Sequence, residues 1–301
     1  MKLSITLAVI LLIQNTAWAE NERVEFPVLP ASESQQLPDI YGNLVVWQQY
    51  VTEYGDYDIF VADINNPGQP LFIGSYESDQ TNPAIFEKYI VFQNYFVGQD
   101  AQDWDIKLID ISDINEPYIY NVTAIENNDE KNPAIHGNII VWEDGFSPYR
   151  NIYGSDITEL DNPREFLIKA VNADQRNPAV YRNTVIWQAL NQGGSGQDYF
   201  AGNWDIYASD IWQRNKPIEY PVSLVEYDQE RTAISETMVV WSDNFFGNWD
   251  IYAADISDLE GPQEIPISVN DWDEKNPDID GNIIVWQALD QSGSGQDNRS
   301  G

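Results

Sequence analysis

The residues of this chain best suited to chemistry are carboxylates that recur at one position. Each stands four residues before a proline or its equivalent: Asp79, Asp129, Asp174, Asp228 and Asp273. Loops rich in carboxylate oxygens suit Ca²⁺ or another hard cation. The same side chains can instead cap their own turns by accepting backbone hydrogen bonds. The sequence therefore predicts either a ring of calcium ligands or a set of capped turns here, and it calls for no other cofactor.

Aromatic residues in polar loops form a second set of candidates. The loops differ in length from one part of the chain to the next, and they carry Tyr50, Tyr54, Tyr95, Phe96, Phe146, Tyr149, Tyr199, Phe200, Phe245 and Phe246. Aromatic rings in variable loops can stack on sugars or anchor a protein partner. They can also fold back and serve packing. These ten residues are the predicted ligand-binding positions, with the packing interpretation left open.

The inventory of other side chains restricts catalysis. The chain has no cysteine and one histidine, His136, which occupies a slot filled elsewhere by tyrosine, phenylalanine, serine or aspartate. Thiol chemistry, histidine-rich zinc sites and Ser-His-Asp triads are therefore disfavoured, and we predict no catalytic residue. A pair of carboxylates for sugar cleavage stays available in so acidic a chain, which leaves a carbohydrate-active hydrolase or lyase as an alternative.

These candidates belong to a repeat, which indicates the fold more strongly than local propensity does. One motif, a short apolar run that ends in an aromatic residue, occurs at residues 37–47, 82–92, 132–142, 177–187, 231–241 and 276–286. Its closing aromatics are 45, 50, 45, 54 and 45 residues apart. This period is typical of one blade of a β-propeller.

Each unit predicts four short antiparallel strands, A to D. Examples are Pro-Ala-Ile at 83–85 for A, Ile-Ile-Val-Trp at 139–142 for B, Asp-Ile-Tyr at 205–207 for C and Phe-Leu-Ile at 166–168 for D. Gly-Asn pairs between A and B suit hairpins that need positive φ. No segment keeps a helical period. We predict an all-β chain that forms a β-propeller of six blades with four strands each.

The two ends of the repeat are irregular. Residues 24–29 resemble a strand D that precedes the first strand A, and this strand is expected to complete and close the last blade. The sixth unit supplies A and B, and its ending at 293–297 copies residues 194–198 without the strand C that follows them there. We therefore expect an incomplete last blade and a truncated C-terminus, or seven blades in a longer parent.

The first nineteen residues have the layout of a secretory signal peptide. Lys2 is followed by an apolar run at 3–13, and small residues at 17 and 19 mark a cleavage site before Glu20. The apolar run is short for a membrane anchor. We expect the propeller domain to span residues 20–301, to be exported to the periplasm, cell surface or exterior, and to insert in no membrane after cleavage.

The net charge of −34 comes from 49 acidic and 15 basic residues. A surface of this sign repels nucleic acid and anionic membranes, and it favours cations or basic partners. It can also serve solubility alone. Nucleic acid is therefore not an expected partner.

The run Asn-Pro-Ala-Ile-x-Gly-Asn-x-Ile-Val-Trp, followed by Gly-Asn-Trp-Asp-Ile-Tyr, resembles the propeller repeats of archaeal and bacterial cell-surface proteins. It is more distantly similar to the propeller of periplasmic TolB. The third unit departs from the pattern with Arg150-Asn151, and the fifth with Arg231-Thr232. The resemblance implies a propeller in the cell envelope and brings no catalytic residues.

The B–C and D–A loops of a propeller emerge on one side, so the aromatic and acidic candidates should share a face. This arrangement predicts a non-catalytic recognition or scaffold module that binds an envelope protein or glycan. The alternatives are the carboxylate hydrolase or lyase and a purely structural surface-layer module.

Overall fold

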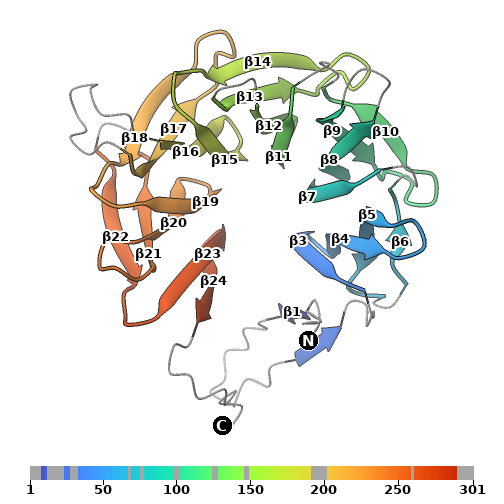
Figure 1. The fold of residues 1–301 in the computed structure, drawn as a ribbon, viewed down its shortest axis with the longest axis horizontal. Coiled ribbons are helices and arrows are strands. Elements are labelled where there is room, and N and C mark those ends of the chain that lie inside the picture. Colours follow the sequence, from blue (N-terminus) through green and yellow to red (C-terminus); the bar gives the residue numbers. More distant parts are fainter. Residues whose placement is uncertain are drawn as a thin grey trace. The chain divides into compact units, whose positions relative to one another are not determined.

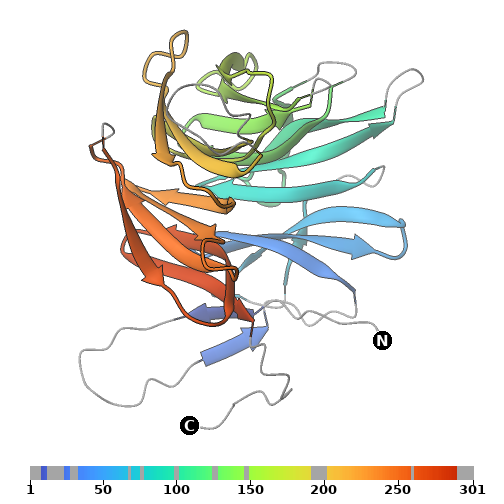
Figure 2. The ribbon, with the colours of Figure 1, turned by 60° about the vertical axis from the view of Figure 1, so that its left-hand side comes forward.

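The computed structural model describes residues 8–11, 24–27, 33–66, 69–74, 78–97, 102–123, 128–145, 149–190, 202–258 and 261–289. These residues form strands and turns, and none of them is helical. Contacts divide the chain into a first unit, Met1–Gly137 with Glu159–Pro163, and a second unit, Asn138–Thr158 with Arg164–Gly301. Figures 1 and 2 show the individual sheets as twisted antiparallel ribbons.

The first unit holds two four-stranded sheets, ordered β3-β4-β5-β6 and β7-β8-β9-β10. Their strands are β3 (Gln35–Tyr41), β4 (Leu44–Val51), β5 (Asp56–Asp63), β6 (Leu71–Phe72), β7 (Gln80–Phe86), β8 (Tyr89–Val97), β9 (Gln102–Asp110) and β10 (Tyr118–Asn121). Each sheet follows the predicted order A to D along the chain.

The remaining sheets repeat this order as β11-β12-β13-β14, β15-β16-β17-β18 and β19-β20-β21-β22, and β23 pairs with β24. The strands are β11 (Glu130–His136), β12 (Ile139–Asp144), β13 (Asn151–Asp156), β14 (Arg164–Lys169), β15 (Gln175–Tyr181), β16 (Thr184–Leu190), β17 (Trp204–Asp210), β18 (Ile218–Ser223), β19 (Gln229–Ser235), β20 (Met238–Asp243), β21 (Asp250–Asp255), β22 (Gln263–Ser268), β23 (Asp273–Asp280) and β24 (Ile283–Leu289). The prediction of tandem four-stranded units is confirmed.

Strand B is a buried inner strand in each of the five four-stranded sheets, which explains its near-continuous apolar sequence. Its closing aromatics are fully buried in five sheets: Trp47, Phe92, Trp142, Trp187 and Trp241. Four of these tryptophans stack on the aromatic ring opposite them in strand C, with centroids 5.9–6.5 Å apart. The repeated tryptophan is therefore a packing requirement, as its recurrence predicts.

Apolar side chains also join successive sheets within each unit. In the first unit, Val46 and Ile59 of one sheet pack in a single cluster with Ile90 and Phe92 of the next. In the second unit, a similar cluster unites Ile186 and Ile206 with Trp241 and its neighbours. Burial on both faces of the inner strands holds these sheets together.

Strand A carries a β-bulge that the sequence did not reveal. The pairing of strand A with strand B shifts register at the same place in five sheets, for example between Thr81 and Ala84. The residue at the slip has positive φ: Leu37, Asn82, Asn132, Asn177, Arg231 and Asn276. Asparagine tolerates this conformation, and the proline that usually follows has no N–H to pair. The Asn-Pro motif is thus explained by the bulge.

The chain ends depart from one expectation. Val24–Pro27 forms β2, which pairs with β1 (Ala8–Leu11) in a separate two-stranded sheet. The prediction that this segment closes the last blade is therefore wrong for the structure described. A nearby apolar strand is an easier partner than one at the far end of the chain, because closing a short loop costs less entropy. Among the described residues the β23-β24 sheet has two strands, and Trp286 of β24 is 37% exposed.

Candidate functional site

The repeated aspartates of the D–A loops hold each loop against strand C of the sheet that the loop leaves. A backbone N–H at the start of strand C donates to an aspartate Oδ1 in four sheets: Tyr57 to Asp79 at 2.9 Å, Arg150 to Asp174 at 3.1 Å, Trp204 to Asp228 at 3.0 Å and Trp249 to Asp273 at 3.1 Å. Asp129 pairs with Lys131 at 2.8 Å. Within the described residues, no group of three or more histidine, cysteine or acidic side chains is arranged to hold a metal.

The aromatic candidates among the described residues lie at the ends of strands B or in the B–C loops. Tyr50 packs edge-on against Tyr57, with centroids 5.3 Å apart, and Tyr95 lies 5.1 Å from Trp104. Tyr54 is exposed and Tyr149 half-buried. Phe146, Tyr199 and Phe200, and the side chain of Phe96, lie outside the described residues.

One aromatic group in the second unit joins both kinds of loop. The ring centroids of Phe245 and Phe246, in one B–C loop, lie 4.7 Å apart. The ring centroid of Phe245 also lies 5.2 Å from that of Tyr227 in the preceding D–A loop. The three side chains are 46%, 62% and 40% exposed, respectively. We call them the aromatic triad. Their contact supports the expectation that B–C and D–A loops share one side of a sheet.

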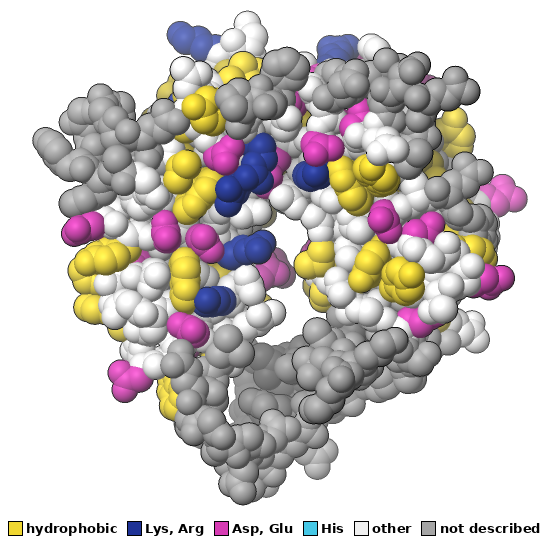
Figure 3. Space-filling model, in the orientation of Figure 1, with side chains coloured by type: hydrophobic (Ala, Val, Ile, Leu, Met, Phe, Trp, Pro, Cys, Tyr) yellow, Lys and Arg dark blue, Asp and Glu magenta, His cyan; other side chains and the backbone are white. Residues whose placement is uncertain are grey.

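Basic side chains beside these loops were not predicted. Arg176 lies 4.0 Å from the ring centre of Trp204, Lys275 lies 4.9 Å from that of Trp249, and Lys131 lies 5.7 Å from that of Trp104. Figure 3 shows basic side chains close to acidic and hydrophobic ones on the face that it draws. The signal was present in the sequence, because a Lys or Arg precedes the Asn-Pro pair in three repeats.

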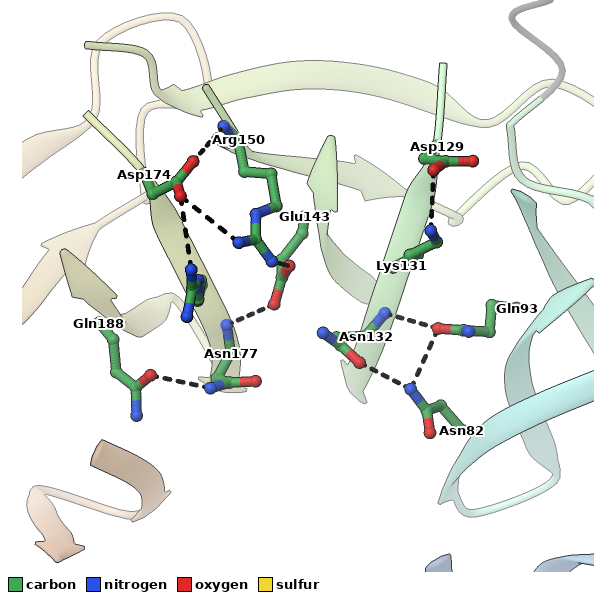
Figure 4. A network of polar contacts seen from close by, with 11 residues as sticks. Asn82, Gln93, Asp129, Lys131, Asn132, Glu143, Arg150, Asp174, Asn177 and Gln188 are labelled. Carbon is green, nitrogen blue, oxygen red and sulfur yellow. Dashed lines mark hydrogen bonds and ion pairs between the residues drawn. The ribbon is translucent and has the colours of Figure 1, made fainter. Parts of the chain in front are cut away.

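Figure 4 shows how polar side chains connect the bulges of strand A with strand B. In the first unit, Gln93 Oε1 accepts from Asn82 Nδ2 at 3.1 Å and from Asn132 N–H at 3.0 Å. In the second unit, Glu143 Oε1 accepts from Asn177 N–H at 2.7 Å. These bonds tie each sheet to the next through the bulge residue.

We number the four-stranded sheets in chain order, so that β3-β6 is the first and β11-β14 the third. The third sheet adds an ionic bridge to this network. Arg150 Nη1 lies 3.2 Å from the buried Glu143, and Arg150 Nη2 lies 3.4 Å from Asp174. Burial alone would raise the pKa of Asp174, but the Arg150 N–H and the charges of Arg150 and Arg176 bring that pKa below its ordinary value. Arg150 therefore places a charged side chain at the repeat position that holds an aromatic residue in the other four-stranded sheets.

His136 belongs to a stack of rings at the ends of strands A. Phe86 lies between Tyr41, at 4.8 Å, and His136, at 4.3 Å. The three residues occupy equivalent repeat positions, and the variety of residue types at this position in the repeat agrees with a packing role. A packing role accounts for the histidine.

Comparisons with known proteins agree with the tandem-sheet architecture. No family model matches the chain, and no curated protein matches it in sequence. Solved structures do match. The β-propeller domain of the trilobed protease from Pyrococcus furiosus is 16% identical with a TM-score of 0.52, and the match covers 85% of this chain and 89% of that domain. The chain folds as a β-propeller.

Two further matches are to parts of longer proteins. A puromycin-hydrolysing peptidase of Mycobacterium tuberculosis is 14% identical with a TM-score of 0.57, and the match covers 81% of this chain and 39% of that chain. The tricorn protease is 12% identical with a TM-score of 0.54, with coverages of 84% and 24%. At these identities the likeness concerns the fold alone, and the propeller spans well under half of each peptidase.

Proposed function

We propose that this propeller is a non-catalytic recognition or scaffold module that binds a protein or glycan through its B–C and D–A loops. The observation that carries the proposal is the aromatic triad, in which three large rings from two loops stay exposed while touching one another. Exposed aromatic clusters of this kind commonly serve as anchors in binding sites. The cations over Trp204 and Trp249 add charge next to rings in the same type of loop.

The cell envelope is the proposed location. The signal-peptide pattern at residues 1–19 and the resemblance to cell-surface and TolB-like propellers support export. In the described part of the chain, no helix is long and apolar enough to cross a membrane. An envelope protein or surface glycan is accordingly the proposed partner.

The test compares two exposed aromatic sites. The double variant Phe245→Ala with Phe246→Ala removes most of the triad, and Trp212→Ala removes a 75% exposed ring from the C–D connection of another sheet. Each purified protein is applied to a glycan array and used as bait in envelope extract. We expect the wild type and the Trp212 variant to capture the same ligand and the double variant to lose at least tenfold in affinity.

Equal binding by the double variant would contradict the role of the triad. If the wild type captures neither glycan nor protein, the recognition function is wrong and a purely structural module becomes the better account.

A further inference from the structure

The fourth and fifth sheets treat a buried aspartate of strand C in the same way. Asn203 Nδ2 donates to Asp205 Oδ1 at 2.8 Å, and Asn248 Nδ2 donates to Asp250 Oδ1 at 3.1 Å. Each amide nitrogen also lies near two carbonyl oxygens of the D–A loop, at 2.6 and 3.4 Å in the fourth sheet and at 2.8 and 3.1 Å in the fifth. The amide thus places N–H donors at the centre of a group of carboxylate and carbonyl oxygens.

The second sheet replaces this amide by a carboxylate and adds an amine. Asp103 stands at the asparagine position, two residues before Asp105. Lys107, two residues further along β9, places its Nζ 3.7 Å from Asp105 Oδ2. Because the chain provides its own cation, the second carboxylate does not leave this sheet with uncompensated negative charge.

The first sheet has the carboxylate without the compensation. Asp56 stands at the asparagine position beside Asp58, and Phe60 stands where the second sheet has Lys107. Asp58 is fully buried, and neither of its carboxylate oxygens has a hydrogen-bond partner among the described residues. Asp56 Oδ1 is also buried and unpartnered there. Burying carboxylate oxygens without a donor or a cation is strongly unfavourable.

A second donor is missing at the same place. At the end of strand D, Thr123 and Ser268 donate their hydroxyls to glutamates of the following strand A, at 3.1 and 2.9 Å. The first sheet has Gly74 instead. A Cβ on Gly74 would lie 2.2 Å from Gln80 Oε1 and 3.1 Å from Asp58 Oδ1. The absence of a Cβ at Gly74 therefore lets Gln80 Oε1 approach the backbone in the neighbourhood of Asp58 Oδ1.

The electrostatics agree with this geometry. Burial, followed by the charges of Asp56 and Asp79, raises the pKa of Asp58 to about 7. The pKa of Asp56 is raised by burial and by Asp79. A bound cation would relieve both effects, because it attracts the carboxylates and replaces their lost hydration.

We propose that the first sheet binds one Ca²⁺ ion between the carboxylates of Asp56 and Asp58, at the place that an asparagine amide occupies in the fourth and fifth sheets. Two neutral oxygens are available as further ligands. One is Gln80 Oε1, which lies with Asp58 Oδ1 beside Gly74. The other is the carbonyl oxygen of Ser78, which stands at the repeat position of the Tyr227 and Trp272 carbonyls that accept from the asparagine amides. Water completes the six to eight oxygen ligands that Ca²⁺ prefers. This site has two carboxylates. It therefore differs from the metal sites with three or more histidine, cysteine or acidic side chains, which are absent from the described residues.

The decisive variant is Asp56→Asn, which gives the first sheet the amide of Asn203 and Asn248. Protein stripped with chelator is titrated with CaCl₂ by calorimetry, and thermal unfolding is followed with Ca²⁺ or EDTA at constant ionic strength. We expect one Ca²⁺ per wild-type chain and a rise in Tm of about 5 °C at saturating Ca²⁺. The variant should lose both effects, while its Tm in EDTA is at least that of the wild type.

Glu53→Gln is the matched control, since it removes one exposed carboxylate from the preceding B–C loop and should leave Ca²⁺ binding unchanged. Tb³⁺ emission sensitised by nearby aromatic rings gives a second readout that does not depend on stability. The proposal is overturned if Asp56→Asn binds Ca²⁺ as the wild type does. It is also overturned if NaCl produces the same rise in Tm as CaCl₂ at equal ionic strength, or if the wild type binds no Ca²⁺ at pH 8.

Discussion

Each of the six A–B turns places one residue at positive φ, a conformation that glycine adopts readily and that residues with a Cβ do not favour. The repeat uses Gly42, Gly137 and Gly281 at the first turn position, with φ of 58°, 61° and 54°. The other three hairpins hold Glu87, Arg182 and Glu236 at φ of 54° to 55°. A residue with a Cβ pays about 1 kcal/mol or more for this region, and glycine does not.

Replacing Glu236 by glycine should therefore stabilise the chain by about 1 kcal/mol. Glu236→Ala removes the same exposed side chain but keeps the Cβ, so it should leave the free energy of unfolding nearly unchanged. Urea denaturation of both variants measures the difference. Equal stabilities of the Gly and Ala variants would show that the turn stores no conformational cost.

A second residue-scale prediction concerns Asp243, which is 3% exposed at the end of β20. Burial raises the pKa of Asp243 to about 6, against the hydrogen bond from Phe245 N–H, which lowers it. The folded state therefore holds this proton more tightly than the unfolded state, and the carboxyl costs stability as pH rises from about 4 to about 6. Asp243→Asn should gain stability relative to the wild type across this window.

Asp255 provides the opposite case in the same sheet. The backbone hydrogen bond from Ser257 lowers the pKa of Asp255, so its ionised form stabilises the fold and this contribution disappears at acidic pH. Asp255→Asn should therefore lose stability relative to the wild type above pH 4. Urea unfolding at several pH values checks both signs. Parallel curves for the two variants would contradict the assignment.

At the scale of elements, the third sheet departs from the repeat at two positions that touch. Strand B has Glu143 where most repeats have glutamine, and Arg150 directly precedes strand C at a position where three repeats have tryptophan. Glutamine at this position still accepts the bulge N–H, as Gln48 and Gln93 do at 2.9 and 3.0 Å. The two departures therefore compensate each other through the ion pair.

A double-mutant cycle of Glu143→Gln and Arg150→Trp tests this compensation. Arg150→Trp alone leaves a buried carboxylate without its main cation and should cost about 3 kcal/mol. Glu143→Gln should cost about 1 kcal/mol, and the double variant less than the sum, with a coupling of about 1–3 kcal/mol. The surface pair Lys88 and Asp110, whose side chains are 47% and 14% exposed, is the control, with an expected coupling under about 1 kcal/mol. Additive effects in the third sheet would refute the compensation.

The sequence predicted the elements well because the repeat reports each strand five or six times over. Strands A to D, the A–B turns and the buried tryptophans all followed from spacing and apolar pattern. The bulge did not, because Asn-Pro reads equally well as a turn or a strand start. The cations beside Trp104, Trp204 and Trp249 were missed because basic residues were weighed only as part of the net charge. The unpaired Asp58 appears only when burial and hydrogen bonds are known.

At the scale of the whole molecule, the charge remains the dominant feature that no single contact explains. The net charge of −34 repels itself in the folded state, and the described ion pairs offset only part of it. Added salt shortens the Debye length from about 30 Å at 0.01 M to about 3 Å at 1 M, which weakens this repulsion more in the folded state than in the expanded one.

Thermal stability should accordingly rise with NaCl, by about 5 °C between 0.02 and 0.5 M, and KCl should act equally. Asp56→Asn should keep this dependence while losing the response to Ca²⁺, because screening acts on all the carboxylates and coordination on two. Calorimetric scans in each salt, with EDTA present, measure the effect. A Tm that stays constant or falls with salt would mean that the acidic surface is already balanced, and the charge would then contribute to solubility without opposing the fold.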